Sequence, residues 1–255
     1  MCKQAEKLLL TELGLLNFKP STKNISIKSF NESFENSGRL DSEYYQPKYD
    51  ELEEKILETY EVGRLSDYLV VNQRGTQPSY AEYGLPVINS KYVQEGEVLL
   101  TDNRLATLPD KDDALFIQKE DVLINGTGVG TIGRSATYLQ DQDAIPDNHV
   151  TILRTKNLNP IFLSVYLNSI AGKYQVDKYF KGSSGQIELY PKDIDNFYIP
   201  LVSDEIQQTI AEKVKSSFKL KAESKKLLDL AKQAVEMAIE QDEEAAIKLI
   251  KAYEG

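Results

Sequence analysis

The chain has 255 residues, of which 41% are hydrophobic and 27% charged, as in a globular protein of one or two domains. The single cysteine, Cys2, excludes a disulfide framework or a cysteine-rich metal site within one chain and fits a reducing cytoplasm. Acidic residues outnumber basic ones by 40 to 30 overall, and by 18 to 13 between Glu61 and Pro200, so net charge cannot attract phosphate groups. Any nucleic-acid binding would need a local basic face or a partner protein.

No membrane contact is expected from the sequence. The first residues lack the apolar core of a signal peptide, and no apolar run approaches the ~20 residues that a spanning helix needs. We therefore expect a cytoplasmic protein.

Two helices are predicted before residue 60. Apolar residues recur at helical spacing from Lys3 to Leu16, with Gly14 near the end of the pattern. A polar connector follows at Asn17–Asn24. A second helix is expected from Pro47 to Thr59, where the apolar residues again share one side.

From Val62 to about Pro200 the pattern predicts short strands joined by turns. Glycine, proline, asparagine and aspartate punctuate this region. The apolar runs that we interpret as strands are Tyr68–Val71, Leu85–Ile88, Asp121–Ile124 and His149–Leu153. One helix is expected at Pro160–Tyr179, with Pro160 in the first turn, where its missing N–H costs nothing. The region is predicted to be a mixed α+β globule.

A glycine cluster, Gly128, Gly130 and Gly133, matches the spacing of a dinucleotide-binding motif. That motif functions only if its last glycine opens a helix facing pyrophosphate. The following run, Arg134–Leu139, alternates like a strand, which favours a tight hairpin with positive φ angles. A nucleotide-binding enzyme using this cluster remains an alternative.

The segment from Ser203 to Tyr253 contains no glycine or proline and is predicted to be a long helix. A helix of about 50 residues would extend roughly 75 Å, so its apolar stripe must fold back on itself or pair with another chain. Asp242 interrupts the stripe, and a bend is expected at Gln241–Glu244. The residues that we assign to a partner or oligomerisation face are Val214, Leu228, Ala231, Val235 and Ala238.

Catalytic motifs are missing from the sequence. His149 is the only histidine, no nucleophile elbow accompanies a serine, and paired metal-ligand spacings are absent. A lone histidine in a strand-like run is interpreted as structural. We therefore expect a non-catalytic chain with no metal and no cofactor of its own.

Three polar turns offer side chains suited to reading base edges. Arginine pairs with guanine, and asparagine or glutamine with adenine, in the major groove, while hydroxyl and backbone N–H groups suit phosphate. The turns are Asn72–Pro78, Asn89–Tyr92 and Lys181–Gln186. The candidate DNA-binding residues are Gln73, Arg74, Thr76, Gln77, Asn89, Lys91, Tyr92, Lys181, Ser183, Ser184 and Gln186.

The order of these pieces resembles the specificity subunit of type I restriction–modification systems. In that family a Gly-Ser turn leads through a hydrophobic "IPL" segment into a long helix, and Phe180–Leu189, Asp193–Leu201 and Glu205–Ile210 follow that order. The glycine cluster matches the family's central "G.G.IG" pattern. Arg39–Pro47 looks like the segment that introduces a target recognition domain.

The resemblance implies a fold and a division of labour. A target recognition domain (residues 21–202) lies between an N-terminal helical segment (1–20) and a long helical conserved or dimerisation region (203–255) that forms a coiled-coil-like arm. The domain would read one half of a split target in double-stranded DNA, and the helices would dock methyltransferase subunits. S-adenosylmethionine, ATP and Mg would be bound by those partners and by a restriction subunit.

The resemblance implies two target recognition domains in a full-length specificity subunit, whereas this chain contains one. It is either a half-size subunit or the C-terminal half of a longer one, and we expect a homodimer through the long helices. The alternatives are the recognition module of a fused restriction–methylation enzyme and a coiled-coil scaffold whose globule binds protein.

Overall fold

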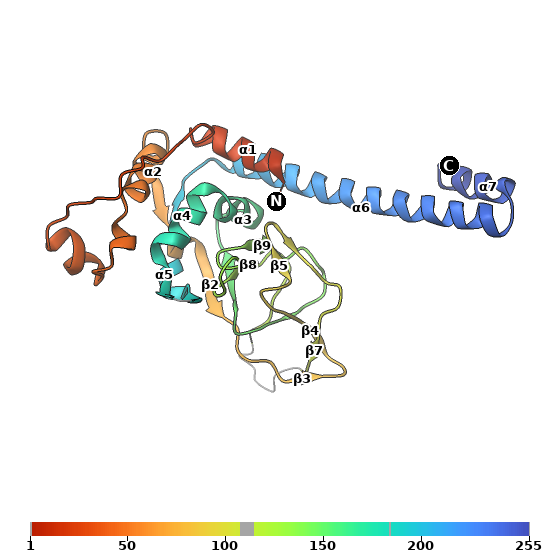
Figure 1. Ribbon diagram of the computed structural model, residues 1–255, viewed down its shortest axis with the longest axis horizontal. Coiled ribbons are helices and arrows are strands. Elements are labelled where there is room, and N and C mark those ends of the chain that lie inside the picture. The colour runs from red at the N-terminus through yellow and green to blue at the C-terminus, as the bar shows by residue number, and fades with distance from the viewer. Residues whose placement is uncertain (1, 108–114, 184, 255) are drawn as a thin grey trace. The chain divides into compact units, whose positions relative to one another are not determined.

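The computed structural model describes residues 2–107, 115–183 and 185–254 (Figure 1). The chain divides into two compact units, one ending at Ala211 and the other beginning at Glu212. No helix among the described residues is both long and apolar enough to span a membrane.

The helices of the first unit largely follow the predicted pattern. They are α1 (Lys3–Glu12), α2 (Pro47–Leu57), α3 (Pro160–Asn168), α4 (Ile170–Tyr179) and α5 (Pro191–Ile194), with single turns of π-helix at Asn31–Glu35 and of 3-10 helix at Ser42–Tyr45 and Leu65–Tyr68. Helix α1 ends earlier than expected because Gly14 adopts a left-handed φ of 67°, which terminates a helix.

The predicted helix at Pro160–Tyr179 is in fact two helices. Ser169 has an extended ψ of 172°, which ends α3 and begins α4. A Cβ atom on Gly172 would lie 2.3 Å from the Leu167 backbone, so the glycine lets the first turn of α4 pack tightly against the end of α3.

Two four-stranded sheets form the centre of the first unit. One has the order β2-β11-β8-β9 and is antiparallel throughout, with β2 at Leu69–Arg74, β11 at Val150–Thr155, β8 at Val122–Asn125 and β9 at Ser135–Thr137. The other has the order β10-β4-β7-β3, with β10 at Ile145–Pro146, β4 at Leu85–Ile88, β7 at Leu105–Ala106 and β3 at Tyr80–Ala81. Three two-stranded pairs complete it: β1 (Val62–Arg64) with β14 (Tyr198–Pro200), β5 (Val93–Gln94) with β6 (Glu97–Val98), and β12 (Lys181–Ser183) with β13 (Gln186–Glu188).

The main core lies against the first sheet. Leu123, Val150 and Ile152 from its strands are fully buried with Ile88 and Tyr138. Helix α3 lies beside β8 and β9 (Figure 1) and is locked there by Asn168, whose side chain accepts a hydrogen bond from the Ser135 amide and donates one to its carbonyl. The predicted α+β fold is confirmed.

The second unit is helical and contains the predicted bend. Helix α6 (Asp204–Glu240) and helix α7 (Glu243–Glu254) are separated at Gln241–Asp242, where the Asp242 carboxylate accepts a hydrogen bond from the Ala245 amide at 2.8 Å and caps α7. Helix α7 turns back beside the end of α6 (Figure 1). Among the predicted face residues, Val214 is buried and Ala238 half-buried, while Leu228, Ala231 and Val235 are exposed.

Candidate nucleic-acid interface

The hairpin β12–β13 projects polar residues at its tip. Gly182 and Gly185 adopt φ angles of 99° and 86°, and a Cβ on Gly182 would lie 2.1 Å from the Gln186 carbonyl oxygen. Ser183 and Gln186 are exposed, as expected for contact with DNA, whereas the predicted Ser184 lies outside the described residues. The hairpin thus forms only because glycine occupies both positions.

A groove of about 540 Å³ runs along one side of this hairpin. An isolated β-bridge joins Glu188 of the hairpin to Thr127, so the turn after β8 is fixed beside it. The groove's lining includes Thr127, Gly128, His149, Gln186, Glu188 and Tyr190. The side chains and main-chain groups of these residues supply both hydrogen-bond donors and acceptors.

The glycine cluster forms a tight turn whose first glycine, Gly128, lines the groove. Gly128, Gly130 and Gly133 all have positive φ angles, of 94°, 80° and 78°. The Gly133 amide bonds back to the Asn125 carbonyl at 2.8 Å, and strand β9 follows. A strand stands where a dinucleotide-binding motif needs a helix, so the hairpin interpretation is confirmed.

His149 lies in this groove, although the sequence analysis treated it as structural. Strand β11 begins one residue later, and His149 is exposed, with Nδ1 2.8 Å from the Thr127 hydroxyl. Its amide donates to the Asp147 carboxylate at 2.9 Å. Burial raises the pKa of Asp147 above its ordinary value, against the opposing effects of that hydrogen bond and of the His149 ring. The Asp147-Asn148 turn before the apolar run was the sequence signal for an exposed histidine.

The predicted turn Asn72–Pro78 divides into two parts. Its first residues belong to β2, where Asn72 donates to the Pro191 carbonyl and the Asp195 carboxylate, and Arg74 turns inward. Gln73, Thr76 and Gln77 are exposed. The structure therefore brings Asn72 and Arg74 to the segment that follows the hairpin, whereas Gln73, Thr76 and Gln77 face solvent.

The predicted turn Asn89–Tyr92 does not line the groove. The Asn89 side chain accepts a hydrogen bond from the Lys91 amide, and Lys91 forms a 3.0 Å ion pair with Asp102. Tyr92 is 4% exposed and packs in the core, donating through its hydroxyl to the Asp102 carbonyl. Asn89 and Lys91 thus form a separate surface patch.

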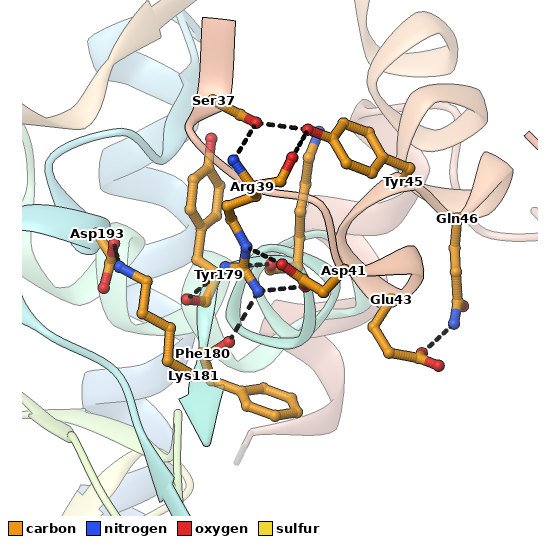
Figure 2. A network of polar contacts seen from close by, with 11 residues as sticks. Ser37, Arg39, Asp41, Glu43, Tyr45, Gln46, Tyr179, Phe180, Lys181 and Asp193 are labelled. Atoms are coloured by element: carbon orange, nitrogen blue, oxygen red, sulfur yellow. Dashed lines mark hydrogen bonds and ion pairs between the residues drawn. The ribbon is translucent and has the colours of Figure 1, made fainter. Parts of the chain in front are cut away.

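A polar network anchors the hairpin at its base (Figure 2). The guanidinium of Arg39 pairs with both oxygens of Asp41 at 2.8 and 2.5 Å and donates to the carbonyls of Tyr179 and Phe180, where α4 ends. Hydrogen bonds from that guanidinium lower the pKa of the Asp41 carboxyl. Beside it, Lys181 pairs with Asp193 at 2.7 Å. The segment that contains Arg39 and Asp41 is therefore tied to the end of α4, directly before the hairpin.

Charge around the groove is balanced rather than basic. Arg74 stands 3.9 Å from Glu188, and Lys181 is paired with Asp193. Neutral groups such as the Gln186 amide and the Thr127 hydroxyl dominate the lining. Groups of this kind discriminate between bases but do not attract the DNA backbone strongly. No cluster of three or more potential metal ligands occurs within the described ranges.

The family of the chain follows from comparison with known proteins. A family model described as the type I restriction modification DNA specificity domain matches residues 57–231. The chain belongs to this family, as the sequence resemblance predicted. No curated protein matches the chain significantly.

Several solved structures are similar over part of their length. The HsdS subunit from Thermoanaerobacter tengcongensis is 18% identical, with a TM-score of 0.45 over 66% of this chain and 39% of that one. The S subunit of a type I restriction-modification system from M. genitalium is 14% identical, with a TM-score of 0.41 over 69% of this chain and 41% of that one. A structure whose title describes complex assembly of the type I R-M system is 16% identical, with a TM-score of 0.47 over 94% of this chain and 53% of that one. The chain thus spans between 39% and 53% of the length of these structures.

Proposed function

We propose that this chain is the sequence-reading subunit of a type I restriction–modification complex and recognises one half of a bipartite target in double-stranded DNA. Membership of the DNA specificity family, together with an exposed glycine-hinged hairpin beside a neutral polar groove, supports this function. The reading domain is placed at residues 21–202 and the helical region at 203–255.

The residues proposed to face DNA belong to two surfaces. The first is the groove and hairpin, with Thr127, His149, Ser183 and Gln186. Ser184 stays a candidate from the sequence alone, because it lies outside the described residues. The second comprises polar residues of the other two turns: the exposed Gln73, Thr76, Gln77 and Lys91, and the half-buried Asn89. Tyr92 is left out because its ring is buried. Amide, hydroxyl and imidazole groups at these positions have the donor and acceptor patterns that base edges require.

Catalysis is assigned to partner subunits. Methyltransferase subunits would bind S-adenosylmethionine and methylate adenine, and a restriction subunit would use ATP and Mg. Partners that grip the duplex would also supply the attraction to phosphate that a chain with a net charge of -10 lacks.

Pairing of two copies is proposed through the long helices. Leu228 and Val235 lie seven residues apart on α6 and are 56% and 60% exposed, as on an unfilled seam. A homodimer would present two reading domains and so recognise an inverted repeat with a fixed gap.

Selection from random duplex DNA, with the methyltransferase partner present, tests this function. Wild type should enrich one bipartite sequence, and Gln186→Ala should relax preference at particular base pairs by about 1–3 kcal/mol each. Gln142→Ala is the matched control, since Gln142 is exposed and does not line the groove. Failure of the wild type to enrich any sequence would contradict the proposal.

A further inference from the structure

The Arg74 side chain lies beneath the segment that follows the recognition hairpin. It belongs to the last residue of β2 and is only 18% exposed. One guanidinium nitrogen, Nη2, donates to the Leu189 carbonyl at 2.5 Å and lies 3.4 Å from the Gly126 carbonyl. The Tyr190 ring covers the guanidinium at 5.2 Å.

The three segments that Arg74 joins are distant in sequence. They are the end of β2, the residue after β8 and the residues after β13. The Leu189 amide also donates to the Gly126 carbonyl at 2.8 Å, so Gly126 accepts from both the hairpin and the arginine. Arg74 therefore lies at the point where hairpin and glycine turn are fixed to the sheet.

Gly126 makes this arrangement sterically possible. A Cβ atom at this position would lie 2.6 Å from Nη2 of Arg74 and 3.1 Å from the Leu189 carbonyl oxygen. Any other residue would displace the guanidinium from both carbonyls. The missing side chain of Gly126 thus leaves room for the Arg74 guanidinium beside both carbonyls.

We propose that Arg74 is a positioning residue that sets the hairpin against the glycine turn, and so the width of the groove, rather than a residue that reads a base. The inference rests on the proposed function of the groove in DNA recognition. A bidentate contact with guanine needs two outward N–H groups. In this chain Nη2 is bound to main-chain carbonyls, and Nε is buried with no hydrogen-bond partner among the described residues.

Hydrogen exchange on the full chain without DNA tests the clamp itself. Arg74→Lys keeps the charge but offers a single nitrogen, which cannot reproduce the guanidinium's geometry. We expect about tenfold faster exchange at the Leu189 amide, while amides in the β2–β11 ladder keep their wild-type rates. Arg104→Lys is the matched control, because Arg104 stacks on Tyr80 next to the other sheet. Unchanged exchange at Leu189 would overturn the clamp.

A double-mutant cycle in the DNA selection tests its role in recognition. Arg74→Lys should relax preference at the same base pairs as Gln186→Ala, with the combined variant losing less than the product of the two fold-changes. Arg74→Lys could instead relax the preference for guanine at one position whose preference Gln186→Ala leaves unchanged. That result would identify Arg74 as a base-reading residue and overturn the inference. If wild type enriches nothing, the proposed function fails and the recognition role of the clamp with it, whereas the exchange experiment still decides the contact itself.

Discussion

Asp147 shows how a single buried carboxyl beside the groove influences the whole fold. It is 5% exposed, and burial raises its pKa despite the hydrogen bond from the His149 amide. A raised folded-state pKa means that folding disfavours the charged carboxylate. The resulting cost is absent below the unfolded-state pKa, grows as pH rises through the folded-state pKa and is constant above it.

Asp147→Asn should therefore stabilise the protein at pH 7, because the amide keeps the acceptor for His149 and removes the charge. The gain should shrink as the pH falls towards 4. Urea denaturation at both pH values measures it. Asp141→Asn is the control, since Asp141 is 91% exposed in its pair with Lys119. A gain that does not change with pH would point to packing rather than ionisation.

A comparison of alanine substitutions at Gly133 and Gly130 separates the cost of backbone strain from the cost of a steric clash. Both adopt left-handed φ angles, of 78° and 80°. A Cβ at Gly133 would lie 2.8 Å from Val176, whereas one at Gly130 would have no atom of the other described residues within 4 Å, its chain neighbours aside. Gly130→Ala should lower the free energy of unfolding by about 1 kcal/mol and Gly133→Ala by about 2–3 kcal/mol, measured by urea denaturation. Equal losses in the free energy of unfolding for the two variants would show that α4 shifts to accommodate the added methyl group.

At the scale of elements, Arg39 stabilises the end of α4 and the start of the hairpin together. Its guanidinium satisfies carbonyls at the negative end of the helix dipole and pairs with Asp41. Arg39→Ala should cost about 1–2 kcal/mol of unfolding free energy, with Arg39→Lys recovering part of it.

Thermal and urea unfolding measure the Arg39 effect. Lys119→Ala provides the comparison, because solvent screens its exposed ion pair with Asp141 and the pair should contribute little to the free energy of unfolding. A loss for Arg39→Ala as small as that of Lys119→Ala would mean that the carbonyl contacts contribute nothing net.

Local patterns in the sequence predict the elements better than their assembly. The strands, the glycine turn and the bend at Asp242 follow from spacing and turn chemistry, which are properties of neighbouring residues. The break at Ser169 was missed because the apolar pattern continues across it. The groove was missed for a different reason: it depends on contacts such as that of Arg74 with Leu189, which are 115 residues apart. Composition likewise cannot tell an inward arginine, such as Arg74, from an outward one.

At the scale of the whole molecule, the exposed seam of α6 leads to a test of oligomeric state. Replacing Leu228 and Val235 together by lysine should convert the proposed homodimer to a monomer, because like charges would meet across the seam. Light scattering at micromolar concentration measures the mass. Lys226→Glu, two residues away and on the other side of the helix, should leave it unchanged. A monomeric wild type would contradict the proposed pairing.

The hairpin β12–β13 is held to the rest of the first unit through contacts at its base. Its base is held by Lys181, Leu189 and the Thr127–Glu188 bridge, while a Cβ on Gly185 would meet no atom within 4 Å among the described residues that are not its chain neighbours. Exchanging the side chains at Ser183 and Gln186 therefore costs the scaffold little folding energy. If these residues read DNA as proposed, a few substitutions at the hairpin can change the target sequence. Engineered or natural variants can then differ in the DNA that they bind while they share one fold.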